Sequence, residues 1–193
     1  METRIAGILL AAGSSKRFGS DKVLYKLENG DPIGIKAAKK LKQFVDDTKI
    51  VLPKRNKQRE KHFRTLNFSI IQNSKERPEL SMTLKAGISA IQNFDYCIIA
   101  LADMPFISKE TYSSMVNILR SEHFDLVAPS FNNQRGHPVG ISSAVMQHFL
   151  ENERRAMIKD YFENDQFSKY IFPTDDPGVI HDIDYPSDLV IQH

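Results

Sequence analysis

Short apolar runs alternate along this chain with longer segments in which apolar residues recur at helical spacing. The runs are rich in Ile, Val and aromatic residues, and they lie at residues 5–10, 49–52, 68–71, 96–101 and 126–128. Unbroken apolar runs of this length are typical of strands that are covered on both faces. They predict a sheet that is buried between helices.

Two of the intervening segments follow the periodicity of an amphipathic helix. In the first, the apolar positions are Ile33, Ala37, Leu41 and Phe44, and lysines fill the other faces. In the second they are Tyr112, Met115, Val116 and Leu119, and Ser108 precedes them as a candidate N-cap. Alternating strands and helices favour an α/β fold with a parallel or mostly parallel sheet and helices on both faces.

The C-terminal third has a weaker pattern. It predicts a strand over 137–141, helices over 144–150 and 156–162, and two short late strands at 171–172 and 179–180. A further helix is predicted to open at Ser81. Since the chain contains no internal repeat, low-complexity tract or linker, residues 1–193 are interpreted as a single domain.

Composition and charge narrow the class of protein. The 26 basic and 24 acidic residues give a formal net charge of +2, whereas nucleic-acid binders usually carry a marked basic excess. Cys97 is the single cysteine, which excludes a disulfide framework and a cysteine-cluster zinc site. The chain has no apolar run near the ~20 residues of a membrane span, and its first residues lack the pattern of a secretory signal. We expect a cytoplasmic protein that binds neither nucleic acid nor membranes.

A glycine-containing loop follows the first predicted strand and carries the strongest functional signal. Small residues around Gly13 and Gly19 allow a ligand to approach the backbone closely, and successive amides there can bind an anion. Arg17 and Lys22 add positive charge that suits a triphosphate. The spacing matches neither a P-loop nor the dinucleotide fingerprint. The alternative is an ordinary turn with solvated basic side chains.

Three aspartates form a second group of candidate site residues. Asp103 directly follows the apolar run at 96–101, where ligands of open α/β sheets gather. Asp182 and Asp184 alternate in a later segment, so an extended backbone would direct them to the same side. One or two aspartates suffice for Mg²⁺, which also binds phosphate oxygens and water. The alternative for Asp103 is a turn or a helix cap.

The loop spelling Leu-Ala-Ala-Gly, followed by Arg17, Gly19 and Lys22, resembles the signature of the MobA-like nucleotidyltransferases. The resemblance implies a Rossmann-like three-layer α/β/α nucleotidyltransferase fold and transfer of a nucleoside monophosphate from an NTP. It also implies that Arg17 and Lys22 bind phosphates and that Asp103, with Asp182 or Asp184, binds Mg²⁺. The residues that it assigns to the nucleotide are Leu10, Ala11, Ala12, Gly13 and Ser14.

The start of the helix predicted at Ser81 resembles a third motif of the family. The family usually has Ser-Ser-Leu-x-x-Gly here, with nucleotide contacts, and in this chain Thr83 retains a hydroxyl at the second serine position. The resemblance therefore implies nucleotide contacts for Ser81 and Thr83. From the local sequence alone, Ser81 is equally compatible with a simple N-cap.

The string Gly136-His137-Pro138-Val139 resembles the MocA subgroup, which transfers CMP to molybdopterin, and places His137 toward the acceptor. The Gly-Asp-x-Gly-Ala-Arg-like segment of that subgroup is replaced here by residues 151–157, without its glycines. The resemblance implies CTP and molybdopterin as substrates, with transient contact to a molybdoenzyme or its chaperone. The alternatives are a guanylyltransferase, a sugar- or polyol-phosphate nucleotidyltransferase, and a non-catalytic nucleotide- or cofactor-binding module.

Overall fold

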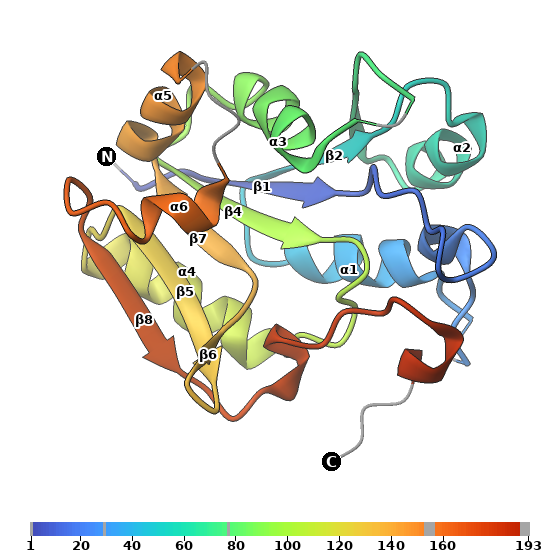
Figure 1. Cartoon of the computed structure of the whole chain (residues 1–193). Coiled ribbons are helices and arrows are strands. Elements are labelled where there is room, and N and C mark those ends of the chain that lie inside the picture. The colour runs from blue at the N-terminus through green and yellow to red at the C-terminus, as the bar shows by residue number, and fades with distance from the viewer. Residues whose placement is uncertain (1, 29, 77, 153–156, 190–193) are drawn as a thin grey trace.

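The structure is a computed structural model that describes residues 2–28, 30–76, 78–152 and 157–189 (Figure 1). Its strands are β1 (Ile5–Leu10), β2 (Asp47–Leu52), β3 (Ser69–Gln72), β4 (Tyr96–Leu101), β5 (Leu126–Phe131), β6 (Gln134–Arg135), β7 (Val139–Ser142) and β8 (Lys169–Pro173). Its α-helices are α1 (Ile33–Lys42), α2 (Lys57–Thr65), α3 (Leu80–Ser89), α4 (Lys109–Ser121), α5 (Ser143–Glu151) and α6 (Ile158–Tyr161). Three 3₁₀ turns are η1 (Lys22–Leu24), η2 (Pro177–Val179) and η3 (Pro186–Leu189). None of the helices in these ranges combines the length and the apolar character needed to cross a membrane.

The described strands join one mostly parallel sheet. Its order is β3-β2-β1-β4-β7-β5-β6, with β8 on the other side of β5. β7 runs antiparallel to both of its neighbours, β4 and β5, and β6 is antiparallel to β5. Leu10 pairs with Val51 of β2 and with Leu101 of β4, so these three strands end at the same edge. The loops that follow β1 and β4 therefore leave the sheet side by side.

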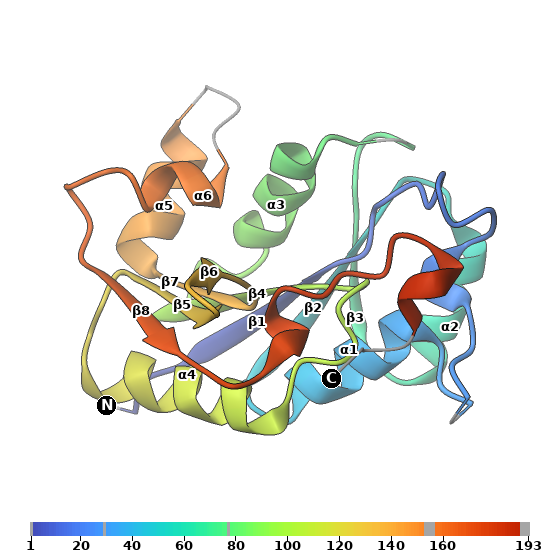
Figure 2. The same ribbon diagram turned by 60° about the horizontal axis from the view of Figure 1, so that its bottom comes forward.

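Alternate residues of β1 face two separate cores. Ile5 and Leu9 pack in a cluster with buried residues of α1, α2 and α4, whereas Ala6 and Ile8 pack with those of α3, α5 and α6. All six residues of β1 are buried, as expected for a strand covered on both faces. Figure 2 shows helices above and below the sheet. The predicted α/β class, with a mostly parallel sheet and three layers, is confirmed.

Most predicted elements are present, with shifted ends. The strand predicted over 137–141 is β7, which begins at Val139, and the helix predicted over 144–150 is α5. The helix predicted over 156–162 is α6, although Ala156 lies outside the described residues. The strand predicted at 179–180 is wrong: Asp176 accepts a hydrogen bond from the Gly178 N–H, and Pro177 then starts the 3₁₀ turn η2.

The helix caps decide the two N-cap predictions, those for Ser108 and Ser81. Ser108 accepts a hydrogen bond from the Thr111 N–H at the start of α4, which confirms it as the N-cap. The alternative that Ser81 is an N-cap is wrong, because α3 begins one residue earlier and Glu79 occupies the cap position.

The sequence patterns did not predict α2. Its buried residues are Phe63 and Arg59, so it has no apolar stripe, and most of its other side chains are charged. The usable signal was the N-cap Asn56, whose side chain accepts a hydrogen bond from the Arg59 N–H at 3.0 Å.

Candidate active site

The segment after η2 brings two aspartates to the end of β4. The Ile183 N–H donates a hydrogen bond to the Asp103 carbonyl oxygen at 2.9 Å, and the Ile183 side chain is fully buried against Phe18 and Ile33. With Ile183 anchored inward, the flanking residues Asp182 and Asp184 turn toward Asp103. One carboxylate oxygen from each of the three aspartates lies within 4.8 Å of the others. The structure therefore assembles all three aspartates that the sequence singled out.

Two basic residues of the glycine loop pair with this acidic cluster. The Lys22 Nζ atom lies 2.8 Å from Asp103 Oδ2 and 3.1 Å from Asp184 Oδ1, and it donates to the Ile183 carbonyl at 2.8 Å. The Arg17 guanidinium lies 2.5 Å from the other oxygen of Asp184. Burial works to lower the pKa of Lys22, but the charges and hydrogen bonds of Asp103 and Asp184 outweigh it and raise that pKa.

The charge balance and the donor atoms of this cluster fit a divalent cation. Three carboxylates against Lys22 and Arg17 leave one uncompensated negative charge. Carboxylate oxygens are the donors that Mg²⁺ and similar hard cations prefer, and a cation that bridges to phosphate needs few protein ligands. Asp103 and Asp184 are partly buried, whereas Asp182 is exposed.

A buried arginine from α2 holds the glycine loop. Arg59 is 3% exposed and binds Asp21 through Nε, at 2.8 Å from Oδ2. Its Nη1 donates to the Ala11 carbonyl at 2.6 Å and its Nη2 to the Gly13 carbonyl at 3.0 Å, and a contact to Ser15 Oγ follows at 3.3 Å. A guanidinium can make all these bonds at once because its donors form a rigid planar fork. Sequence reasoning missed both Arg59 and Asp21.

Three N–H groups of the glycine loop have no partner among the described residues. With the Ala11 and Gly13 carbonyls turned to Arg59, the N–H groups of Ala12, Gly13 and Ser14 donate to no other described residue. These residues line a cavity of about 430 Å³ whose other walls include Lys16, Pro53, Asn56, Arg59 and Glu76. Unpaired amides on a concave loop are a binding site for anions such as phosphate.

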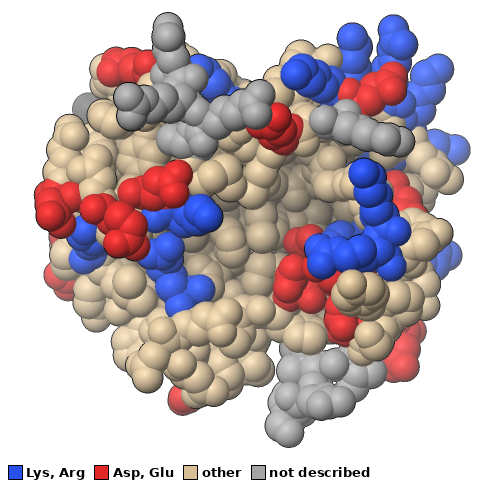
Figure 3. All heavy atoms as spheres, in the orientation of Figure 1, with Lys and Arg blue, Asp and Glu red and all other residues tan. Residues whose placement is uncertain are grey.

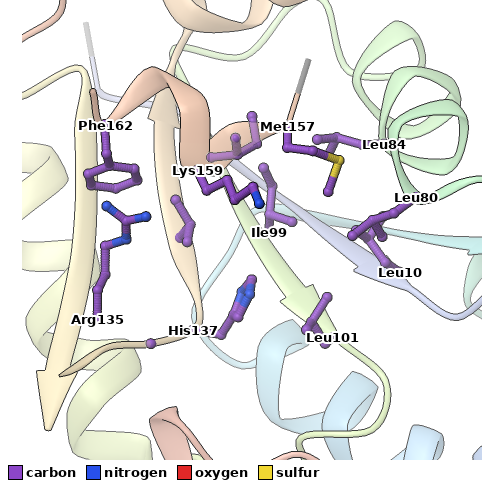
Figure 4. A pocket seen from close by; sticks show the side chains of 13 residues that line it. Leu10, Leu80, Leu84, Ile99, Leu101, Arg135, His137, Met157, Lys159 and Phe162 are labelled. Carbon is purple, nitrogen blue, oxygen red and sulfur yellow. The ribbon is translucent and has the colours of Figure 1, made fainter. Parts of the chain in front are cut away.

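A second pocket of about 230 Å³ opens between α3, α6 and the ends of β1, β4 and β7. Nine of its thirteen lining residues are apolar, and the others are Arg135, Gly136, His137 and Lys159 (Figure 4). Figure 3 shows a hollow at the middle of this face, with acidic and basic side chains on both sides of it. Leu101, which lines this pocket, is the last residue of β4, and Asp103 follows two residues later, so the pocket adjoins the acidic cluster.

The remaining predicted site residues take different positions. Leu10 lines the second pocket rather than the loop cavity. Ala11 is buried, and its N–H and carbonyl are bonded to Val51 and Arg59. The Thr83 hydroxyl, also buried, donates to the Glu79 carbonyl and accepts from Asn73, which ties α3 to the end of β3. Ser81 lies in the first turn of α3 and is partly exposed.

Residues 7–167 match the sequence profile of the MobA-like NTP transferase domain. The chain belongs to the MobA-like family. It is therefore a nucleotidyltransferase of that family, and the family resemblance carried by the loop motif is confirmed. The matched region includes the loop, Asp103 and His137 but ends before Asp182 and Asp184.

Three curated relatives have related names. A "Probable molybdenum cofactor guanylyltransferase" of Thermococcus sibiricus is 29% identical over 79% of this chain and 74% of its own length. A protein of the same name from Natranaerobius thermophilus is 27% identical over 67% of this chain and 62% of its own. A 2-C-methyl-D-erythritol 4-phosphate cytidylyltransferase of Dictyoglomus thermophilum is 31% identical over 58% of this chain, which spans 51% of that relative.

Two solved structures are similar to this chain in fold. A nucleotidyl transferase from Methanothermobacter matches with a TM-score of 0.80 at 20% identity, over 96% of this chain and 94% of that one. Rv0371c of Mycobacterium tuberculosis in complex with manganese matches with a TM-score of 0.78 at 15% identity, over 96% of each chain. At identities of 15% and 20%, this similarity shows a shared fold and nothing about activity.

Proposed function

We propose that this protein transfers a nucleoside monophosphate from an NTP to a phosphate-bearing acceptor and releases pyrophosphate. The observation that carries the proposal is the assembly of the anion-binding loop and the acidic cluster at one edge of the sheet, joined by the ion pair between Lys22 and Asp103. Such a transfer needs no protein nucleophile, because the acceptor phosphate already presents an anionic oxygen. Catalysis then consists of alignment and charge neutralisation.

The chain's own groups divide this work between them. The amides of Ala12, Gly13 and Ser14 bind the polyphosphate, and Arg59 holds the loop through the Ala11 and Gly13 carbonyls. Arg17 and Lys22 stabilise negative charge that develops on the leaving pyrophosphate, as cationic side chains do in phosphoryl transfer. The side chains of both residues contact the aspartates. Ser81 and Thr83 remain proposed contacts to the nucleotide, although the Thr83 hydroxyl is already bonded to Glu79 and Asn73.

Asp103, Asp182 and Asp184 are the residues that would hold a divalent cation, which we propose to be Mg²⁺. When bound, the cation supplies charge neutralisation at the phosphate oxygens. The support in this chain is the close approach of three carboxylates that retain one net negative charge beside two basic residues.

For the acceptor we propose molybdopterin, bound in the pocket that His137 lines. Support comes from the names of two relatives, which act in molybdenum cofactor synthesis, and from the apolar pocket walls, which suit a flat heterocycle better than a polyol. A polyol phosphate is the second candidate because the third relative is a methylerythritol phosphate cytidylyltransferase. Transient contact with a molybdoenzyme or its chaperone would follow from delivery of the product.

For the nucleotide, the subgroup motif around His137 favours CTP. GTP is the competing candidate because two relatives are named guanylyltransferases. The test is release of pyrophosphate from each of the four NTPs with Mg²⁺, with molybdopterin or 2-C-methylerythritol 4-phosphate as the acceptor. Release that needs both an NTP and an acceptor supports the proposal. Binding of NTPs without release for any acceptor would instead identify a non-catalytic nucleotide-binding module.

A further inference from the structure

The Lys22 ammonium has three oxygen partners inside the acidic cluster. Its Nζ atom lies 2.8 Å from Asp103 Oδ2, 3.1 Å from Asp184 Oδ1 and 2.8 Å from the Ile183 carbonyl oxygen. The lysine side chain is 8% exposed, so the ammonium has given up most of its contact with water to make these bonds. A lysine ammonium has three N–H donors, and each of them has an oxygen acceptor here.

This pairing conflicts with the roles of the same groups in the proposed function. There Lys22 contacts phosphate, and Asp103 and Asp184 bind a divalent cation, whereas in the structure they neutralise one another. A hard cation would need the carboxylate oxygens that the ammonium contacts. Two positive charges on the same oxygens repel each other strongly because they are so close. These oxygens can therefore hold either the ammonium or the divalent cation.

The backbone of Lys22 lies beside the cavity of the glycine loop. Its N–H donates to Ser15 Oγ at 3.2 Å, and Ser15 lines that cavity together with Gly13. The Asp21 side chain accepts a hydrogen bond from the Val23 N–H at 3.2 Å, which holds the backbone on both sides of Lys22. Since the lysine stem has four flexible carbons, the ammonium can turn from the acidic cluster to the cavity while this backbone stays in place.

Arg17 is a weaker competitor for the carboxylates. Its side chain is 60% exposed and contacts the second oxygen of Asp184. Water and salt screen an exposed ion pair, so it contributes little free energy. Lys22 is buried and also contacts Asp103. It is therefore the group that a cation has to displace.

We propose that the Lys22 ammonium occupies the cation position of the acidic cluster in the free protein and leaves it when a triphosphate binds. The phosphates then become the partner of Lys22, and Asp103 and Asp184 become free for the divalent cation. Cation and triphosphate consequently bind with positive coupling, because each removes a competitor of the other. This inference rests on the proposed function and adds to it a low affinity of the free protein for the cation alone.

Binding of Mn²⁺ alone, followed by the EPR signal of the free ion, tests the competition. Lys22→Met removes the ammonium and keeps an apolar stem, so that the three carboxylates face Arg17 alone. We expect this variant to bind Mn²⁺ at least about tenfold more tightly than wild type. Its affinity for inorganic tripolyphosphate, measured by calorimetry with EDTA present, should instead fall by about tenfold.

Lys49→Met is the matched control. Lys49 is also a mostly buried lysine in an ion pair, at 2.8 Å from Asp47, and it lines neither pocket of the site. This variant should keep both wild-type affinities. Opposite changes in Lys22→Met cannot come from a general loss of structure, which would weaken both ligands. Mn²⁺ affinity that is unchanged, lower or absent in a folded Lys22→Met would overturn the inference, as would an unchanged affinity for tripolyphosphate.

A measurement on the wild-type protein covers the case in which Lys22→Met fails to fold. The ¹⁵N resonance of Lys22 Nζ, assigned through the carbons of its own side chain, should move on addition of Mg²⁺ alone at high concentration. It should also move with tripolyphosphate in the absence of metal. A resonance that stays in place with either ligand would contradict the exchange of partners. The proposed function fails by a different result, the absence of pyrophosphate release, and these binding measurements do not depend on turnover.

Discussion

The Lys22 ammonium and the Asp103 carboxylate, which belong to loops after two different strands, form an ion pair of 2.8 Å with Lys22 almost fully buried. β1 and β4 are neighbours in the sheet and end together, so the loop with the basic residues and the residue that follows β4 share one edge. The segment around Ile183 closes the cluster from a third direction. This contact joins the glycine loop to the acidic cluster.

Asp103→Ala should abolish divalent-cation-dependent release of pyrophosphate while the protein stays folded. The fold should survive because Lys22 retains Asp184 and the Ile183 carbonyl as partners. We expect a loss of at least about 100-fold in kcat, the size found when one charge-stabilising group is removed. Asp165→Ala is the control, since Asp165 is fully exposed on the surface and pairs with Lys169. Turnover that stays at the wild-type rate would remove Asp103 from the mechanism.

Arg59→Lys should weaken NTP binding without changing any residue of the loop. Lysine keeps the charge but lacks the planar fork, so it leaves some of Asp21, Ala11 and Gly13 without donors. We expect KM for the NTP to rise by about tenfold or more, and the free energy of unfolding to fall by about 2–4 kcal/mol.

The matched control for this variant is Arg64→Lys. Arg64 lies on the same helix but is exposed and pairs with Glu60 at 2.8 Å. Its replacement should change neither KM nor stability measurably. A KM in Arg59→Lys equal to that of the control would show that the loop does not need this anchor.

Gly13→Ala should separate ligand binding from stability. A Cβ atom at Gly13 meets nothing within 4 Å, and its φ is not in the left-handed region, so unfolding in urea should change by less than about 0.5 kcal/mol. The added methyl group enters the loop cavity, and KM for the NTP should rise by about tenfold if the phosphates approach the backbone there.

Gly136→Ala, unlike Gly13→Ala, should lower the stability of the fold. Its Cβ would lie 2.1 Å from the Val179 carbonyl oxygen, so the backbone must move and the free energy of unfolding should fall by about 1–3 kcal/mol. Because this contact also positions His137, binding to the apolar pocket should weaken. An unchanged KM in Gly13→Ala would argue that the nucleotide binds away from this loop.

Lys40 should make stability depend on pH above neutrality. Its Nζ donates to the carbonyls of Pro105 and Ile107, in the loop that carries Asp103. Burial, followed by the charge of Lys36, lowers the pKa of Lys40 from 10.5 to about 8. The unfolded chain therefore binds a proton that the folded protein has lost between about pH 8 and 10.5, and the contribution of Lys40 to stability rises with pH in that window.

Urea unfolding of wild type and Lys40→Met at about pH 7.5 and about pH 9.5 measures this effect. The difference in unfolding free energy should move in favour of wild type by about 1 kcal/mol at the higher pH, after partial solvent screening. A difference that stays constant, or that moves toward the variant, would contradict the lowered pKa.

Sequence patterns predicted the layers but left parts of the site undefined. Apolar runs predicted β1 and β4, and the helical spacing of apolar residues predicted α4, because the buried faces of these elements are apolar. The sequence patterns did not predict α2. Its Arg59 is buried because it donates hydrogen bonds to distant backbone carbonyls, and such contacts leave no apolar periodicity in the sequence. The short strand predicted at Val179 failed because Asp176 and Pro177 start a turn there.

The sequence alone determined the fold class and the family and singled out Gly13, Lys22 and Asp103 as candidate site residues, because these depend on local apolar patterns and on motif spelling. Tertiary structure decided which residues meet. The grouping of Asp182 and Asp184 with Asp103 depends on one long-range backbone hydrogen bond and on burial of Ile183. The available loop amides depend on Arg59 in the same way, since such contacts join residues far apart in the chain and are fixed only by packing.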